Sequence, residues 1–198
     1  MNNKSQARRI IAVFLIICIS IGGGILINEA WNAIDRYIYP NDYAEIIADA
    51  SKDFDIPQYI IYAVIKVESG FDPNAVSSSG ALGLMQMKPS TFEWLTGDEH
   101  LGENLSTKKL DTPEVSIRYG TYYLSYLYKK FDYNWDNTIA AYNGGEGNVS
   151  RWLKDPEYSD LQGNLTNIPF QETKNYVKKV NDAIEKYKEL YPETTEIN

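Results

Sequence analysis

The stretch VIKVESGFDPNAVSSSGALGLMQMKP, residues 64–89, joins an apolar helical pattern to a loop rich in serine and glycine. Glu68 ends the helical part and shares a helix face with Ile61 and Val64. Burial and the negative end of the helix dipole both raise the pKa of a carboxyl group at such a position. A carboxyl that stays protonated near neutral pH can act as a general acid. The alternative is that Glu68 faces solvent and merely ends the helix.

The pattern on both sides of this stretch predicts an all-α domain over residues 41–192, because apolar residues recur at helical spacing and no long alternating strand occurs. We expect helices at about 43–54, 57–69, 90–97, 111–131, 136–144, 146–153 and from 170 onward. The motifs STFE (90–93) and DTPE (111–114) match capping boxes at two helix starts. Residues 70–84 and 154–168 are expected to be irregular.

The N-terminal part of the chain predicts a single transmembrane helix. Residues 10–27 carry no charge and are long enough to span a bilayer, at the lower end of the usual range. Three basic residues lie within residues 1–9, which predicts that this end is cytoplasmic and the rest is outside. A cleaved signal peptide is the alternative. Residues 28–40 are expected to form a connector, and 193–198 a C-terminal tail.

Charge and composition restrict the chemistry of the domain. Residues 28–198 contain 27 acidic and 16 basic residues, a net charge of −11, which argues against binding to nucleic acid. The only cysteine, Cys18, lies in the apolar run, and the only histidine is His100. A cysteine nucleophile or a His-rich zinc site is therefore not expected, and neither is a metal or an organic cofactor. Carboxylates, hydroxyls and amides have to carry any reaction.

Three sequence blocks identify a family. They are ESGFDPNAVSSSGALGLMQMKPST (68–91), AAYNGG (140–145) and ETKNYVKKV (172–180). In this order they resemble the soluble lytic transglycosylase (SLT) family of peptidoglycan-cleaving enzymes, and the likeness extends over about residues 41–190. The resemblance implies a lysozyme-like helical domain with a glycan-binding cleft.

The resemblance also implies the site residues. Glu68 matches the family's catalytic glutamate. Seven other residues are expected at the substrate: Ser77, Met85, Gln86, Tyr142, Asn143, Glu172 and Tyr176. Five of the seven also have an ordinary structural explanation: Ser77 as a turn residue, Met85 and Tyr142 as core residues, Gln86 as a cap of a backbone group and Glu172 as a helix-start residue.

The implied reaction cuts the bond between N-acetylmuramic acid and N-acetylglucosamine. Glu68 would act first as acid and then as base, and the muramic sugar would close into an anhydro ring. This predicts a bacterial membrane protein with its catalytic domain outside the cytoplasm and peptidoglycan strands as its partner. Two alternatives remain open, a goose-lysozyme-like enzyme that uses water, and a catalytically silent glycan-binding or scaffolding domain.

Overall fold

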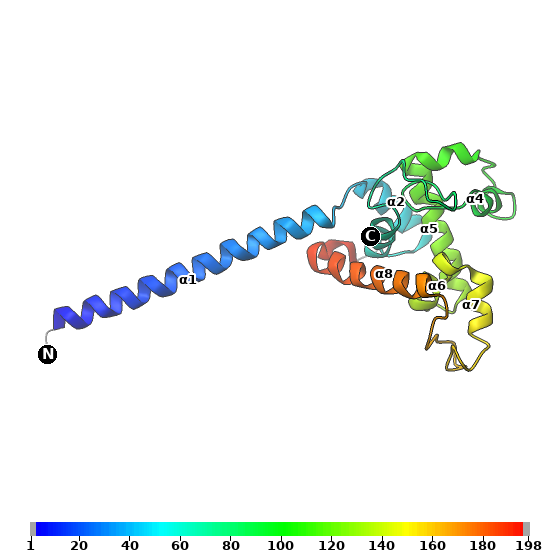
Figure 1. The fold of residues 1–198 in the computed structure, drawn as a ribbon. Coiled ribbons are helices and arrows are strands. Elements are labelled where there is room, and N and C mark those ends of the chain that lie inside the picture. The colour runs from blue at the N-terminus through cyan, green and yellow to red at the C-terminus, as the bar shows by residue number, and fades with distance from the viewer. Residues whose placement is uncertain (1–2, 196–198) are drawn as a thin grey trace. The chain divides into compact units, whose positions relative to one another are not determined.

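The structure is a computed structural model and describes residues 3–195 (Figure 1). In the first helix, side chains are described at residues 8, 9, 14 and 15 and from 17 onward. The chain divides into two compact units, Met1–Pro40 and Asn41–Asn198. The tail expected at 193–198 is described only as far as 195, where a short 3₁₀ helix, η2 (Pro192–Thr195), covers its beginning.

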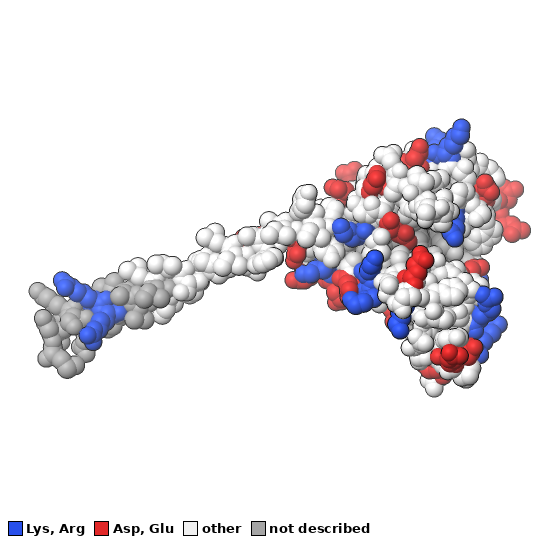
Figure 2. All heavy atoms as spheres, viewed as in Figure 1, with Lys and Arg blue, Asp and Glu red and all other residues white. Residues whose placement is uncertain are grey.

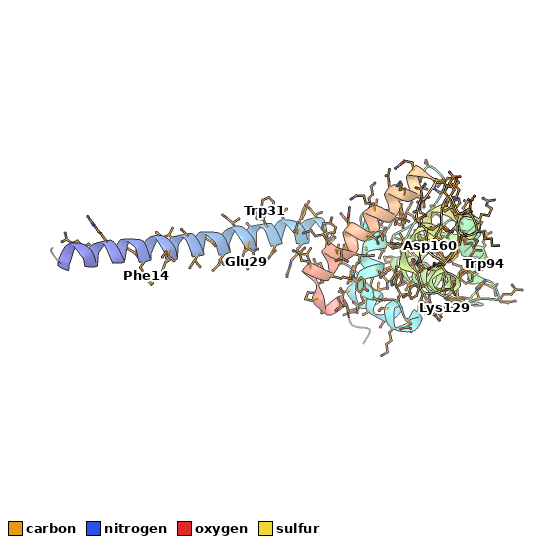
Figure 3. All side chains as sticks on the ribbon, turned by 90° about the horizontal axis from the view of Figure 1, so that it is seen from below. Phe14, Glu29, Trp31, Trp94, Lys129 and Asp160 are labelled. Atoms are coloured by element: carbon orange, nitrogen blue, oxygen red, sulfur yellow. The ribbon has the colours of Figure 1, made fainter. Side chains whose placement is uncertain are left out.

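The first unit consists of one helix, α1 (Asn3–Ile38). Its residues Ile17–Ile38 are long and apolar enough to cross a membrane, and none of this segment is buried. Phe14 and Trp31, which are 65% and 62% exposed, project from different sides of the helix (Figure 3). The helix continues through residues 28–38, where the sequence suggested a connector, because that segment contains no proline or glycine to end it.

The second unit is built from helices joined by irregular segments, the longest at 69–88, 97–106 and 153–170, so the all-α prediction is confirmed. Its helices are α2 (Ala44–Phe54), α3 (Gln58–Glu68), α4 (Pro89–Thr96), η1 (Thr107–Asp111), α5 (Pro113–Lys130), α6 (Trp135–Gly144), α7 (Glu146–Trp152) and α8 (Gln171–Leu190). Residues 3–195 contain no β-strand, only isolated bridges such as Leu82 with Met87.

Helix α3 forms the centre of this unit. Residues 60–65 are each no more than 1% exposed, so the helix is buried on nearly every side rather than along one stripe. It packs against α8 and α2, and α5 packs between α2 and α6. Glu68 is therefore the last residue of a buried central helix, not of a surface helix.

The two predicted capping boxes are wrong, although the helices themselves occur. Helix α4 begins at Pro89 after Lys88, and α5 begins at Pro113 after Thr112. Neither cap residue bonds the helix through its side chain. Proline is suited to the first helical position, since its φ is already helical and it lacks the N–H that would need a partner. In both cases the helix starts at the proline.

Candidate active site

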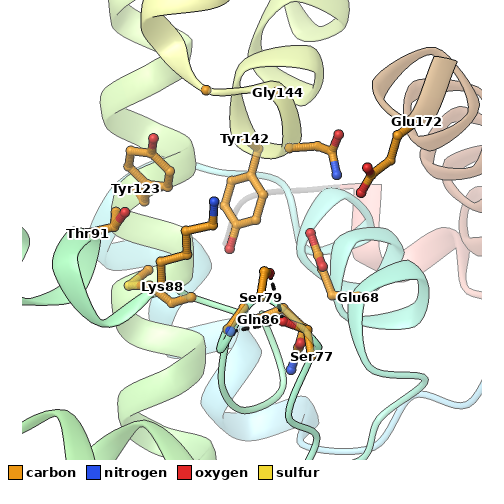
Figure 4. Close-up of a pocket in the computed structure, with 14 residues that line it drawn as sticks. Glu68, Ser77, Ser79, Gln86, Lys88, Thr91, Tyr123, Tyr142, Gly144 and Glu172 are labelled. Carbon is orange, nitrogen blue, oxygen red and sulfur yellow. Dashed lines mark hydrogen bonds between the residues drawn. The ribbon is translucent and has the colours of Figure 1, made fainter. Parts of the chain in front are cut away.

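A cavity of about 330 Å³ opens beside the end of α3. Six of the eight residues expected at the site line it: Glu68, Ser77, Gln86, Tyr142, Asn143 and Glu172. Figure 4 shows Glu68 and Glu172 directed toward the same space, into which the Tyr142 ring also points. The fold thus brings together residues from α3, the loop after it, α6 and α8.

Glu68 is partly buried at the C-terminal end of α3. Its Oε1 accepts a hydrogen bond of 2.7 Å from the hydroxyl of Tyr176 on α8. Burial raises the pKa of the carboxyl to about 7, and the bond from Tyr176, which favours the charged form, offsets part of that increase. Glu68 can therefore both give and take a proton near neutral pH.

Tyr176 does not line the cavity, in contrast to the expected substrate contact. Its side chain is only 7% exposed and its hydroxyl is used by Glu68. Burial and the negative charge of Glu68 raise its pKa well above the usual value. The phenol stays protonated, so Tyr176 is a hydrogen-bond donor that positions the carboxyl group.

Met85 also lies elsewhere than predicted. Its side chain is fully buried and packs so closely on Gly120 that a Cβ there would come within 2.3 Å of the Met85 sulfur. Its carbonyl accepts a hydrogen bond of 2.8 Å from the Tyr142 hydroxyl. Met85 therefore supports Tyr142 from beneath the cavity, and its side chain is not a cavity wall.

The loop between α3 and α4 forms one wall of the cavity, and hydrogen bonds within the loop stabilise its conformation. Ser77 Oγ accepts a hydrogen bond from the amide of Ala81 at 2.9 Å. Gln86 donates from Nε2 to the carbonyls of Ala75 and Gly83, at 3.0 and 2.9 Å. The two side chains thus fix the turns of the loop from the face that lines the cavity.

Helices α6 and α8 supply the opposite wall. Asn143, in the last turn of α6, accepts a hydrogen bond of 2.8 Å through Oδ1 from the hydroxyl of Thr173. Gly144 lies against the same threonine, since a Cβ there would be 3.0 Å from its Oγ1. Glu172 is exposed in the first turn of α8, where the helix dipole favours a negative charge.

Sequence reasoning missed several lining residues, among them Ser79, Lys88, Thr91 and Tyr123. The first three lie inside the block 68–91, so their proximity to Glu68 in the sequence was an available signal. Tyr123 lies on α5, and its ring contacts that of Tyr142 with centroids 5.4 Å apart. Nothing in the local sequence distinguishes it from the other tyrosines of that helix.

The donor set of this cavity suits proton transfer rather than metal binding. Within residues 3–195, no group of three His, Cys, Asp or Glu side chains is arranged to hold a metal ion. The carboxyl of Glu68 lies among neutral phenols, with the exposed carboxylate of Glu172 on the same cavity. Such a site can protonate an ether oxygen and then recover the proton.

Comparison with known proteins relates this cavity to a family. The profile of the transglycosylase SLT domain matches residues 45–162. The chain is 33% identical over 154 residues to the soluble lytic murein transglycosylase of Escherichia coli K12, a match that covers 77% of this chain and 24% of that protein. The chain thus spans about a quarter of the length of this curated relative.

Solved structures agree with the sequence match. The 70-kDa soluble lytic transglycosylase of E. coli superposes with a TM-score of 0.70 at 32% identity, over 80% of this chain and 26% of that one. The lytic transglycosylase Slt of Pseudomonas aeruginosa, solved as an inactive Glu→Gln mutant, gives a TM-score of 0.68 at 34% identity, over 76% and 24% of the two chains. The chain therefore belongs to the transglycosylase SLT domain family.

Proposed function

We propose that the chain is a peptidoglycan lytic transglycosylase that cuts between N-acetylmuramic acid and N-acetylglucosamine. The observation that carries this proposal is the Glu68 carboxyl, whose pKa is raised to about 7 at the edge of a cavity and which Tyr176 holds in place. Relatives named lytic murein transglycosylases support the substrate class. The relative solved as an inactive Glu→Gln mutant supports a central role for a glutamate.

In the proposed mechanism Glu68 acts twice. Its carboxyl gives a proton to the glycosidic oxygen as the bond from that oxygen to C1 of the muramic sugar breaks. The acetamido oxygen of the same sugar stabilises the positive charge that develops at C1. The Glu68 carboxylate then takes the proton of the C6 hydroxyl while O6 bonds to C1, so an anhydro ring forms and the acid is regenerated.

The geometry around Glu68 supports both halves of this cycle. Burial raises the pKa of the carboxyl to about 7, so a substantial fraction is protonated near neutral pH before the first step, as a general acid requires. After the proton has left, the Tyr176 hydroxyl donates to the carboxylate and stabilises the new charge. The residues Ser77, Gln86, Tyr142, Asn143 and Glu172 surround the space in which we place the sugars.

The product of the reaction tests this proposal. Purified peptidoglycan strands are digested with the protein, and the fragments are analysed by mass spectrometry. We expect muramic ends that are lighter by one water than hydrolysed ends. Hydrated reducing ends would overturn the transglycosylase mechanism in favour of a goose-lysozyme-like hydrolase. Binding of strands without any cleavage would favour a silent glycan-binding domain.

We further propose that α1 anchors the domain in the bacterial cell membrane by a single pass, with the domain outside the cytoplasm. The segment Ile17–Ile38 has the required length and hydropathy, and the predicted span 10–27 overlaps it. Basic residues at the N-terminal end favour that end in the cytoplasm. The relatives in the comparison are named soluble, so the anchor is proposed for this chain alone.

Fractionation of cells tests the anchor. Because burial of apolar surface is not screened by salt, the full chain should stay with membranes through a high-salt wash. External protease should reach residues 41–192 in cells whose wall has been removed. Mature protein that begins after residue 27 would overturn the anchor, and a domain protected from protease would overturn the orientation.

A further inference from the structure

Lys88 is the only Lys or Arg among the residues that line the cavity, whose walls also carry Glu68 and Glu172. Its side chain takes no part in the bond between Tyr176 and Glu68, nor in the bonds that Ser77 and Gln86 make within the loop between α3 and α4. The proposed chemistry at Glu68 does not use it.

The backbone at Lys88 is firmly placed. The preceding residue, Met87, exchanges two backbone hydrogen bonds with Leu82, at 3.0 and 3.1 Å. The following residue, Pro89, begins α4, and the carbonyl of Lys88 accepts a bond of 3.0 Å from the amide of Phe92. The backbone hydrogen bonds therefore fix the position of the Lys88 Cα on the cavity wall.

The side chain itself has no partner in the part of the chain that the structure describes. Lys88 is exposed, and its ammonium group makes no hydrogen bond or ion pair with any residue from 3 to 195. Figure 4 shows it pointing into the cavity beside the ring of Tyr142, with Glu68 and Glu172 on the other side of that ring. Neither glutamate is paired with it, and the pKa of Glu68 is set by burial and Tyr176.

Lys88 places a positive charge in a domain whose net charge is negative. Residues 28–198 have a net charge of −11, and Figure 2 shows acidic and basic side chains scattered over the visible face rather than gathered in one basic patch. Such a domain repels an anionic ligand at long range, but repulsion beyond about 8 Å is screened at physiological salt. Inside the cavity, Lys88 is the one group that attracts an anion by charge.

We propose that Lys88 is a specificity-determining residue that binds a carboxylate of the substrate close to the bond that is cut. This inference rests on the proposed function, because it assumes that a glycan strand occupies the cavity. Every muramic sugar carries a lactyl carboxyl group. That group is a free carboxylate on a strand without peptides, and on a peptide-bearing strand it is joined to a peptide that has carboxylates of its own.

The test measures kcat and KM of the full chain, kept in solution with detergent, on three kinds of soluble glycan strand. The first bears peptides, the second has been stripped by an amidase to leave free lactyl carboxylates, and the third is the stripped strand with those carboxylates converted to methylamides. The variants are Lys88→Met and Lys88→Arg. The control is Lys129→Met, which removes an exposed lysine on α5 (Figure 3) that is not among the residues lining the cavity.

We expect Lys88→Met to raise KM about three- to fivefold on a carboxylate-bearing strand, as for a partly exposed ion pair, with kcat unchanged. Lys88→Arg should restore the KM, and Lys129→Met should change nothing. A rise on stripped strands assigns the lactyl carboxylate, and a rise only on peptide-bearing strands assigns a peptide carboxylate. On methylamide strands the wild type and Lys88→Met should have the same KM.

An equal KM for wild type and Lys88→Met on all three strands would overturn the inference, as would the same rise on the uncharged strands. Both results require an active wild type, so they leave the proposed function standing. A wild type that cuts none of the strands would instead refute the proposed function.

Discussion

The two sides of the cavity are built in different ways. On one side, Glu68 lines the cavity and Tyr176 lies behind it, and the two come from regular helices that pack on each other, α3 and α8. On the other side, residues 69–88 have no helix, and their backbone reaches positive φ at five residues. These residues are Gly70, Phe71, Gly80, Gly83 and Gln86.

We infer that the helical side determines the proton affinity of Glu68 and that the loop side determines the shape of the cavity wall. On the helical side, burial by neighbouring helices sets the proton affinity of Glu68, so changes there should act on rate and pH dependence. On the loop side, hydrogen bonds within the loop and unusual backbone angles set the form of the wall, so changes there should act first on stability. Four predictions examine this division.

The largest expected effect is on the rate, at Glu68. Glu68→Gln keeps the shape of the side chain but cannot supply the proton, so kcat on peptidoglycan should fall by at least about 100-fold. The matched control is Glu99→Gln, an exposed glutamate outside the cavity, which should leave kcat unchanged. If Glu68→Gln retained more than half of the wild-type turnover, the helical side would not be the catalytic side.

The next effect is on stability, at Gly83 of the loop. Gly83 has φ +74, and a Cβ there would lie 2.1 Å from the carbonyl oxygen of Leu110. Gly83→Ala combines a left-handed alanine with overpacking and should lower the free energy of unfolding by about 4 kcal/mol. Gly80→Ala, with φ +79 but open space around it, should cost only about 1 kcal/mol. Urea denaturation of residues 41–198 measures both, and equal losses would show that Leu110 does not constrain the loop.

The third effect is on the pH dependence of the free energy of unfolding, and it arises from Glu68 on the helical side. The pKa of Glu68 is about 7 in the folded protein, above the value of 4.5 for an unperturbed glutamate. Below pH 4.5 the carboxyl is neutral in both states and causes no penalty. As the pH rises to 7 and above, the unfolded state ionises more readily, and the wild type loses about 3 kcal/mol of stability. Glu68→Gln should lack this component. Parallel stability curves of the two proteins between pH 4 and pH 8, over which the loss develops, would contradict the buried carboxyl.

The smallest effect is a displacement of the pH profile, at Tyr176. The bond from Tyr176 lowers the pKa of Glu68, so Tyr176→Phe should raise that pKa further. Since the first step needs the protonated acid, the decline of kcat/KM at alkaline pH should move to higher pH. Tyr133→Phe, at a tyrosine that is 65% exposed, is the control and should leave the profile in place. A profile that moves to lower pH in Tyr176→Phe would show that the phenol does not donate to Glu68.

Much of the helical frame could be predicted from the sequence, because helical periodicity and glycine stops are local signals. Helix α6 illustrates both the success and its limit. Its end at Gly144 was expected, but the helix starts at Trp135, one residue before the expected 136. Its cap is Asn134, whose side chain accepts a bond of 3.0 Å from the amide of Asn137. Asn134 and Asp136 lie two positions apart and are both of a type that caps helices, so residue type alone does not rank them.

The site could be predicted only where a motif marks it. Six of the residues expected from the three blocks line the cavity, whereas Lys88, although it lies inside the first block, was not predicted. Whether Met85 and Tyr176 face the cavity or lie behind it depends on packing between α5, α6 and α8, which no local pattern encodes. Tyr123 was missed for the same reason, since it reaches the site only because α5 packs on α6.

The bond between Tyr176 and Glu68 joins residues that are 108 positions apart. During synthesis, α3 is therefore complete long before α8 has left the ribosome. Until α8 packs against α3, the bond from Tyr176 to this carboxylate cannot form, and Glu172 cannot take its place on the cavity wall. The proposed acid is thus synthesised well before its hydrogen-bond donor, and the pair cannot form until the last α-helix of the domain has been made.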